Sequence, residues 1–424
     1  MRDHELRLLL NDELHGRPGL AVEAPARITH LALTLEAGEP DPLLAIRKLC
    51  DAMGVRLPAE GAVHHAVDLA GGLFKYERHG EFYRISVIIP GDGSRVEAIS
   101  ALPLGWVDEL PGRRLVAIHT HVLDQTAPPP DLATLRASFG HDELAGSIVS
   151  QGGATVWTDF RIADDGYTHI LVHDHGLPPI RLGRVCRRIH EIETYRMMAL
   201  LAFPLARAVQ KELLPAETRL TDTINAMTSL KGAEEDARLL AELSAIARDV
   251  EAISNRTSYR FAAARAYAAL VDKRVRELGE ERAQNFQRIG VFLDRRFSPA
   301  MTTCQAVAER IAGLGQRSER ASNLLRTRVD IALEAQNQML LRSMEARARQ
   351  QLMLQETVEG LSVVAISYYL ISILTKFIDG AGEFLPWLNV KLAEWLLIPL
   401  VVVLVFLGLR RLRRKLRNTS GRIK

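Results

Sequence analysis

The C-terminal part of the chain reads WLLIPLVVVLVFLGL from Trp395 to Leu409, and RRLRRKLR follows directly from Arg410 to Arg417. Before it, GLSVVAISYYLISILT from Gly360 to Thr375 forms another run without charged residues. Each run is shorter than the ~20 apolar residues that a helix usually needs to cross a bilayer. Aromatic, Lys and Arg side chains flank both runs and can extend to the polar headgroups. We therefore predict two transmembrane helices with a short loop within residues 359–409, and a basic tail at residues 410–424.

The basic cluster after the second run predicts the orientation of the protein in the membrane. Positively charged residues near transmembrane helices are retained on the cytoplasmic side. Six residues carry this signal: Arg410, Arg411, Arg413, Arg414, Lys415 and Arg417. Arg342, Arg347 and Arg349 precede the first run and place the N-terminal part on the same side. The prediction is an integral membrane protein with two spans and both termini in the cytoplasm, so the lipid bilayer is an expected partner.

Two other interpretations of this region compete with the membrane anchor. The apolar runs could form a buried helical hairpin in a soluble protein, or the basic tail could bind nucleic acid. The second interpretation is disfavoured because no aromatic residues alternate with the basic ones, as they do where single strands are bound by stacking. The formal net charge of the whole chain is only +3, which gives no reason to expect a polyanionic partner. We therefore expect no nucleic-acid partner.

The first part of the chain has the pattern of a mixed α+β domain, which we predict over residues 1–180. All 13 histidines lie before residue 191, together with most of the short apolar alternations. Runs rich in β-branched and aromatic residues, separated by Gly, Pro and Asp, are typical of strands. The predicted strands are 27–36, 81–89, 114–123, 154–162 and 167–174, and the predicted short helices are 42–53 and 130–139. Three cysteines without metal-ligand spacing are expected to be reduced and buried.

Residues 181–358 have the composition of long helices, rich in Ala, Leu, Arg, Glu and Gln. Leu239, Leu243, Ile246, Val250 and Ile253 follow one another in steps of four and three, which is the seam of a coiled coil. A second seam extends from residue 261 to 278, helix breaks are expected at 204, 232 and 298–299, and the last helix is expected over 318–377. This predicts a coiled-coil-like helical stalk. Its seams can be buried within one folded-back chain or in a homo-oligomer, and the pattern does not separate these arrangements.

Polar clusters in the first part of the chain suggest a candidate acid/base or metal site. They occur in NDELHGRP (11–18), KYERHGEFY (75–83) and WTDFR (157–161). The residues that could meet there are Glu13, His15, Glu77, His79, Glu81 and Asp159. In the second cluster, which we interpret as a hairpin turning at Gly80, strand alternation puts Glu77 and His79 on one face. The competing interpretation is a structural network of salt bridges and turn contacts that holds the hairpins and the domain–stalk junction.

A second possible metal site comes from histidines with the period-two spacing of one strand face. These are His119 and His121 in one run, and His169, His173 and His175 in another. Solvent-facing histidines on ordinary strands have the same spacing. The chain lacks a GxxxxGK[ST] phosphate loop, a GxSxG nucleophile elbow and an HExxH zinc motif. We therefore assign no catalytic residue, no metal and no cofactor. Whether the protein is an enzyme stays open, and the missing motifs disfavour it.

Several motifs occurring in order resemble a bacterial family called domain of unknown function 3422. They are NDELHGRP, KYERHGEFY, WTDFRI, RRIHEIETYRMMALLAFPLA (187–206) and VEGLSVVAISYYLISIL (358–374). The resemblance covers approximately residues 5–415. It implies a membrane-anchored protein of the bacterial inner membrane and brings no assigned activity.

The architecture also looks like that of the CorA-type magnesium channels, which have an N-terminal α/β domain, a long helix that enters the first of two spans, and a basic C-terminus. Those channels carry Gly-Met-Asn at the end of the first span, where this chain reads KFIDGA at 376–381. The leading expectation is therefore a non-enzymatic scaffold or sensor at the cytoplasmic face of the membrane. A CorA-like oligomeric transporter of divalent cations is the first alternative, and a metal-dependent or acid/base enzyme in the N-terminal domain is the second.

Overall fold

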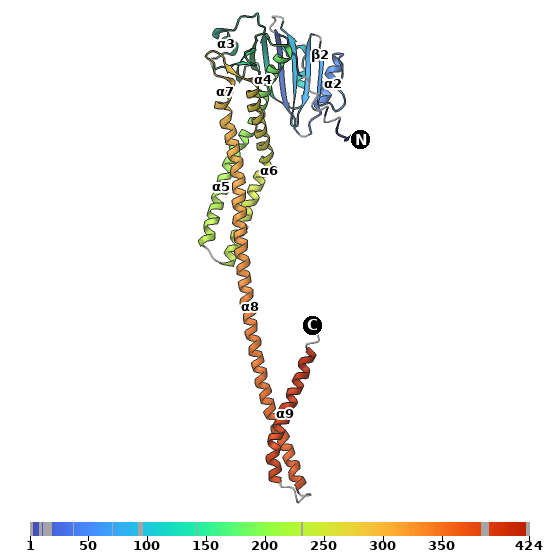
Figure 1. Cartoon of the computed structure of the whole chain (residues 1–424), viewed down its shortest axis with the longest axis vertical. Coiled ribbons are helices and arrows are strands. Elements are labelled where there is room, and N and C mark those ends of the chain that lie inside the picture. The colour runs from blue at the N-terminus through green and yellow to red at the C-terminus, as the bar shows by residue number, and fades with distance from the viewer. Residues whose placement is uncertain are drawn as a thin grey trace. The chain divides into compact units, whose positions relative to one another are not determined.

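The computed structural model describes residues 3–7, 11, 19–36, 38–69, 71–91, 96–141, 143–229, 232–382 and 390–420. Contacts divide the chain into two compact units, Met1–Asn323 and Leu324–Lys424. The first unit contains a β-sheet domain followed by long helices, and the second contains the remainder of one long helix and a further helix (Figure 1). The predicted bounds 1–180, 181–358, 359–409 and 410–424 stay a prediction.

The described part of the first unit contains a nine-stranded sheet with the order β2-β3-β4-β1-β5-β8-β7-β6-β9. Neighbouring strands pair antiparallel except β5 and β8, which are parallel. The bounds are β1 Ala26–Thr34, β2 His64–Leu69, β3 Gly72–Arg78, β4 Phe82–Pro90, β5 Arg113–Leu123, β6 Ala145–Val149, β7 Ala154–Ile162, β8 Thr168–Asp174 and β9 Glu281–Arg282. The five strands predicted from alternation are confirmed as β1, β4, β5, β7 and β8, and the hairpin at Gly80 joins β3 to β4.

Each face of the sheet has its own hydrophobic core, because successive side chains of a strand point to opposite faces. In β4, Tyr83, Ile85 and Val87 pack against α2 (Pro42–Ala52) and two 3-10 helices, Ala98–Ala101 and Trp106–Glu109. On the other face, Phe82 and Ile88 belong to a core with α4 (Pro179–Leu200). The predicted short helices are confirmed as α2 and α3 (Leu132–Phe139). The three cysteines are free and buried, as expected.

Three helices of the first unit pack lengthwise on one another: α5 (Ala202–Ser229), α6 (Ala233–Leu278) and the beginning of α8 (Ser298–Gly382). Arg219 of α5 pairs with Glu242 and Asp249 of α6, and Arg310 of α8 pairs with Glu217 of α5. The seam from Leu239 to Ile253 is buried here, at no more than 7% exposure for any of its five residues. Packing within one chain therefore accounts for this seam.

The expected helix breaks are confirmed with small shifts. α4 ends at Leu200 and α5 begins at Ala202, so Pro204 lies in a first turn, where its missing N–H is tolerated. Gly232 is the N-cap of α6. α7 (Ile289–Arg296) ends just before Ser298, where α8 begins. The expected start of the last helix near residue 318 is wrong. Gly313 and Gly315 lower helix propensity, but packing outweighs that effect. Leu314 is buried, and the Ser318 hydroxyl donates to the Leu243 carbonyl of α6.

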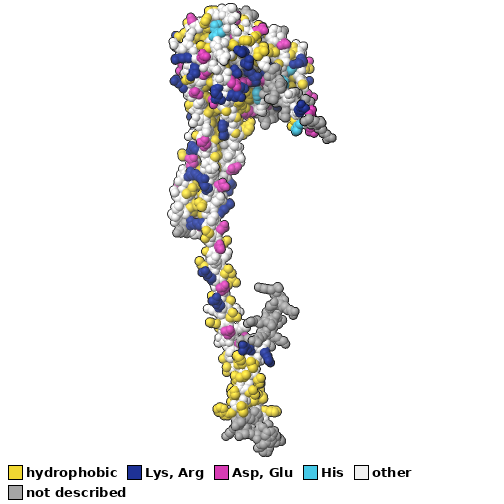
Figure 2. Space-filling model, viewed as in Figure 1, with side chains coloured by type: hydrophobic (Ala, Val, Ile, Leu, Met, Phe, Trp, Pro, Cys, Tyr) yellow, Lys and Arg dark blue, Asp and Glu magenta, His cyan; other side chains and the backbone are white. Residues whose placement is uncertain are grey.

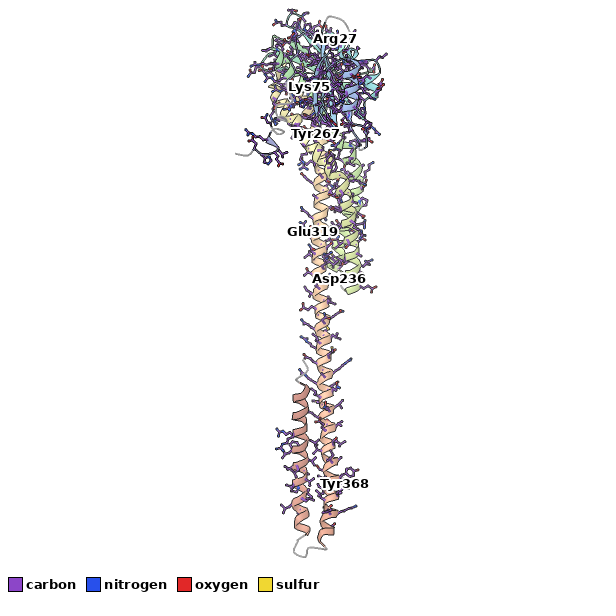
Figure 3. All side chains as sticks on the ribbon, turned by 90° about the vertical axis from the view of Figure 1, so that its right-hand side faces the viewer. Arg27, Lys75, Asp236, Tyr267, Glu319 and Tyr368 are labelled. Carbon is purple, nitrogen blue, oxygen red and sulfur yellow. The ribbon has the colours of Figure 1, made fainter. Side chains whose placement is uncertain are left out.

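The second unit contains the rest of α8 and α9 (Val390–Ser420), which run beside each other (Figures 1 and 3). Within the described residues, one helix is long and apolar enough to cross a membrane, namely α8 over Ser298–Phe377. A buried core helix can meet the same length and composition criterion, but only 6% of the apolar window of α8 is buried. Hydrophobic side chains cover this part of α8 in Figure 2.

The prediction of two spans is therefore shown only for one helix. The second apolar run lies in α9, where the side chains are described from Trp395 to Arg411. These described side chains span seventeen residues, and within the described part of the chain α9 is not found to be long and apolar enough to cross a membrane. A stretch of α8 that precedes the apolar window, residues 331–358, is exposed at every position.

Candidate functional site

A layer of buried charged and polar side chains lies between the sheet and α4. Strand alternation explains it, because residues between the apolar positions of β1, β3, β4 and β5 point to the α4 face. The sheet contributes His30, Lys75, Glu77, Arg84, Ser86 and Thr120, and α4 contributes His190, Glu191 and Thr194. All nine are at most 7% exposed. Figure 3 shows Lys75 inside the sheet domain.

Arg84 and Glu191 are the centre of this layer. The Arg84 guanidinium donates from Nε to Glu77 Oε2 at 2.6 Å and from Nη1 to Glu191 Oε1 at 3.2 Å. Glu191 also accepts hydrogen bonds from Arg187, at 2.8 Å, and from Arg274 of α6. Lys75 Nζ lies 3.1 Å from Glu77 Oε1. The network thus connects β3 and β4 to α4 and α6 through charged hydrogen bonds, which are stronger than neutral ones.

Both carboxylates of the network are held in the charged form. Burial alone would raise the pKa of Glu77, but the charges of Arg84 and Lys75 outweigh it and lower the pKa to about 2. Burial opposes ionisation of Glu191 as well, and the charges of Arg84 and Arg187 lower its pKa nevertheless. Burial lowers the pKa of Lys75, with Glu77 partly compensating. Groups that stay ionised in this way fit a structural role better than proton transfer near neutral pH.

Two stacked histidines complete the layer. The rings of His30 and His190 lie 4.9 Å apart, centroid to centroid. His30 interacts with the hydroxyls of Ser86 at 2.8 Å and Thr194 at 3.2 Å, and His190 Nε2 lies 2.8 Å from Thr120 Oγ1. Burial, the neighbouring imidazole and Arg84 lower the pKa of His30 well below its usual value. Burial and Arg84 lower the pKa of His190 to about 3, so both imidazoles are neutral at pH 7.

The other residues of the predicted acid/base site do not all meet. Glu13 and His15 lie outside the described residues. Glu81 binds Arg260 of α6 through both carboxylate oxygens, each at 2.7 Å, and the His79 ring stacks on Phe82 with centroids 4.4 Å apart. Tyr267, labelled in Figure 3, belongs to the same contact, and burial and its hydrogen bond to Glu81 raise its pKa. These contacts hold the β3–β4 hairpin against α6.

Asp159 is separated from this group. It lies on β7, and four strands of the sheet stand between β3 and β7, which corresponds to about 24 Å. Its carboxylate contacts His141 Nε2 at 2.8 Å and accepts from the Arg161 backbone N–H at 3.0 Å. The predicted gathering of Asp159 with Glu77, His79 and Glu81 is therefore not found in the fold.

Histidines of the second predicted metal site do meet in part. The parallel pairing of β5 and β8 places His119 directly opposite His169. The ring centroids of these two are 5.8 Å apart, and those of His121 and His169 are 6.5 Å apart. Glu97 lies 2.9 Å from His121 Nε2 and 3.5 Å from His119 Nδ1. Each ring also has another neighbour: His119 stacks on Tyr167, and His169 contacts Asp165 at 2.8 Å.

Burial lowers the pKa of His119 to about 4, although Glu97 partly opposes the shift. His173 and His175 form a separate pair, with ring centroids 5.1 Å apart. His173 contacts the Ala127 carbonyl at 3.1 Å, and His175 contacts the Gly152 carbonyl at 2.8 Å. Across the described residues, no group of three or more His, Cys, Asp or Glu side chains has a geometry that could hold a metal ion.

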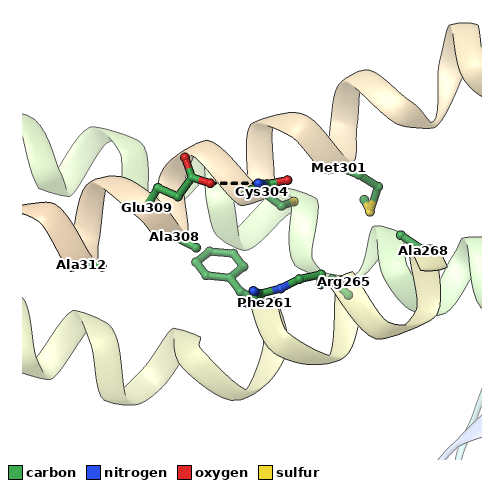
Figure 4. Close-up of a pocket in the computed structure, with 10 residues that line it drawn as sticks. Phe261, Arg265, Ala268, Met301, Cys304, Ala308, Glu309 and Ala312 are labelled. Atoms are coloured by element: carbon green, nitrogen blue, oxygen red, sulfur yellow. Dashed lines mark hydrogen bonds between the residues drawn. The ribbon is translucent and has the colours of Figure 1, made fainter.

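A shallow groove lies between α6 and α8 in the first unit (Figure 4). Its volume is about 310 Å³. Phe261 and Met301 form the apolar wall, and Arg265 and Glu309 lie at the rim (Figure 4). Small side chains widen the seam between the two helices here: Ala264, Ala268, Ala308 and Ala312. The groove therefore results from the small alanine side chains at the contact between α6 and α8.

Sequence reasoning missed most of the buried network. Glu77 was among the predicted residues. Arg187 and Glu191 are four residues apart in α4, a spacing that favours an ion pair on a helix. Lys75, Arg84, His30 and Thr120 were not singled out. The signal that could have found them is a charged or polar residue at every second position of strands whose other residues are apolar.

A family model described as a protein of unknown function, DUF3422, matches residues 2–416. The chain belongs to this family. The match confirms the resemblance inferred from the ordered motifs, and the DUF3422 description carries no activity. No curated protein and no solved structure matches the chain.

Proposed function

We propose that this DUF3422 protein is a membrane-anchored scaffold or sensor whose sheet domain stays on the cytoplasmic face. One observation supports the anchor most strongly: large apolar side chains of α8 are exposed where the charged residues end. Leu361, Val364, Ile373 and Phe377 are 65–77% exposed. A continuous apolar surface of this kind is unfavourable in water and favourable in a bilayer.

The finer arrangement that we propose has two spans, with α9 as the second. Trp395 at the beginning of its apolar run and Arg410 at the end suit the two interfaces of a membrane. Val401 of α9 and Ser367 of α8 are buried in the second unit, consistent with a helical hairpin. Pro399 inside α9 is tolerated in membranes because neighbouring helices can compensate the lost hydrogen bond.

Membrane fractionation tests the anchor, and reporter fusions test the topology. The full-length protein should remain in the membrane pellet after a carbonate wash. A periplasmic reporter such as alkaline phosphatase should be active when inserted after residue 382 and inactive when fused after residue 420. Recovery of the protein in the carbonate supernatant would contradict the anchor, and activity only at residue 420 would contradict the proposed orientation.

We also propose that the chain forms a homo-oligomer through the exposed part of α8. Leu333, Leu340, Met344, Leu354 and Val358 are 56–68% exposed and are separated by 7, 4, 10 and 4 residues. These intervals are sums of three and four, so the five side chains form one coiled-coil stripe. A helix that leaves such a stripe uncovered over 331–358 gains stability when a second copy covers it.

A CorA-like transport activity remains the competing proposal for the same anchor. It requires a closed ring of subunits around a pore, whereas an anchor requires only a monomer or dimer. Sedimentation of the detergent-solubilised protein separates the two, and liposome uptake of Mg²⁺ that is lost on deletion of residues 361–424 would favour transport.

A further inference from the structure

A second hollow in the first unit, lined by arginines, lies beside β9 and α7 and has a volume of about 520 Å³. Arg282, Arg288 and Arg295 line it together with Asn285, Phe286 and Gln287. No Asp or Glu is among its lining residues. The hollow therefore has three arginine side chains and no carboxylate among its lining residues.

The three arginines come from two elements that the fold places side by side. Arg282 is on β9, and Arg288 is the N-cap residue of α7. Val291 and Arg295 are spaced by four within α7, which puts them on one face of the helix. The side chains of Arg282, Arg288 and Arg295 are exposed and make no hydrogen bond or ion pair with any described residue.

Neighbouring arginines differ from these three. Arg296 pairs with Glu143 at 2.9 Å, and Arg274 pairs with Glu191 and Glu277. Arg288 also borders an adjacent hollow of about 370 Å³ whose lining includes Asp272, Glu280 and Asp294. The Glu280 carboxylate accepts hydrogen bonds from the Gly290 N–H and the Ser147 hydroxyl. The arginine-lined hollow itself has no acidic lining residue, so an anion placed in it would be attracted by the three guanidinium charges.

The backbone that carries the arginines is fixed to the sheet before any ligand arrives. β9 pairs with β6, the Gly146 N–H donates to the Gln287 carbonyl at 2.9 Å, and the Ile289 N–H donates to Ser147 Oγ at 3.0 Å. Phe286 packs against a small core that includes Trp157. Gln284 has φ +46°, a left-handed conformation that non-glycine residues rarely adopt and that the surrounding contacts must maintain. A loop fixed in this way loses little entropy on binding.

We propose that Arg282, Arg288 and Arg295 form a binding site for a phosphate-bearing small molecule, with a diphosphate group as the recognised part. Guanidinium groups match phosphate oxygens with paired hydrogen bonds, and a diphosphate group has enough charge to balance three of them. The Asn285 and Gln287 amides can bind polar atoms beyond the phosphates, and the partly exposed Phe286 ring offers an apolar surface. The site lies entirely in the first unit and does not depend on the membrane anchor.

Isothermal titration calorimetry of the full-length protein in detergent tests the site, with inorganic pyrophosphate as the probe at low ionic strength. We expect saturable binding to the wild type, and about tenfold weaker binding after Arg288→Gln or Arg295→Gln. The matched control is Arg248→Gln, which removes an equally exposed and unpaired arginine of α6 and should leave the affinity unchanged. Absence of pyrophosphate binding to the wild type, or equal weakening by Arg248→Gln, would overturn the proposal.

A thermal melt separates loss of the site from loss of the fold. Without ligand, Arg288→Gln and Arg295→Gln should melt close to the wild-type temperature, because both side chains are exposed and unpaired within the described part of the chain. Pyrophosphate should raise the melting temperature of the wild type and of Arg248→Gln by the same amount, and that of Arg288→Gln and Arg295→Gln by clearly less. A short-chain phosphatidic acid serves as the lipid probe. Binding tighter than that of pyrophosphate identifies a lipid headgroup as the phosphate source, and equal or weaker binding identifies a soluble metabolite.

Discussion

At the scale of single residues, we expect removal of the Glu191 side chain to lower the free energy of unfolding more than removal of any other side chain of the buried network. Its carboxylate is 2% exposed and contacts Arg84, Arg187 and Arg274. Glu191→Ala leaves these cations without their shared partner, and loss of one member of a buried ion pair costs about 3–5 kcal/mol. The melting temperature of the solubilised protein should fall accordingly. Glu277→Ala is the control, because that side chain is 30% exposed and its loss should have a small effect. Equal losses would show that burial does not set the cost.

The buried histidines make stability depend on pH at the same scale. Burial and neighbouring charges lower the pKa of His30, and that of His190 to about 3, whereas the unfolded value is about 6.5. Below that value the unfolded chain takes up protons that the folded protein excludes, so the free energy of unfolding falls as pH falls. Between pH 7 and pH 5 the loss is roughly 2 kcal/mol for His190, and His30 contributes a loss of the same sign.

The variant His190→Gln tests how much of this pH dependence comes from His190. His190→Gln should remove about 2 kcal/mol of the loss between pH 7 and pH 5, while the contribution of His30 persists. The glutamates contribute only below about pH 4.5, because their pKa values are lowered in the fold. Melting temperatures of both proteins across this range provide the measurement. The same slope in wild type and variant would contradict a neutral buried His190.

At the scale of elements, two glycines inside helices should respond oppositely to the same substitution. A Cβ at Gly183 of α4 would lie 1.9 Å from the Leu20 carbonyl oxygen, whereas nothing lies within 4 Å of a Cβ at Gly313 of α8. Gly183→Ala should therefore destabilise by about 1–3 kcal/mol through overpacking. Gly313→Ala should stabilise by up to about 1 kcal/mol through helix propensity. Two shifts of melting temperature with the same sign would contradict the close packing of the N-terminal segment on α4.

Comparison of the elements shows which parts of the fold a local sequence pattern can predict. The run 114–123 and β5 (Arg113–Leu123) agree to one residue, because a strand with apolar alternation and turn residues at its ends has a strong local signal. β9 is only two residues long and forms because it pairs with the edge of β6. Its own sequence therefore does not indicate a strand. The charged network had the same limitation. Arg84 and Glu191 are 107 residues apart, and pairing them requires knowing that α4 covers this face of the sheet.

At the scale of the whole molecule, the proposed self-association gives the last prediction. Leu340 and Met344 are one turn apart in the exposed stripe of α8, and both are about 60% exposed. In a monomer, changing both to Glu alters only a solvated surface and should leave the melting temperature nearly unchanged. In a coiled-coil oligomer the same change buries like charges at the seam and should dissociate it. Sedimentation velocity in detergent should therefore show an oligomer for the wild type and a monomer for the double variant.

The control for this prediction places the same two charges on another face of the helix. Ala335→Glu and Gln338→Glu add charge at exposed positions on the side of the helix away from the stripe and should preserve the oligomer. Dissociation by both pairs would indicate general charge repulsion, and dissociation by neither would place any self-association elsewhere in the chain. If the control pair preserves the oligomer and the Leu340 and Met344 pair does not, the polar residues Asn337, Arg347 and Gln351 also lie in the seam. Polar residues at seam positions lower the stability of a coiled coil while fixing its register, which suits an assembly that the bilayer already concentrates.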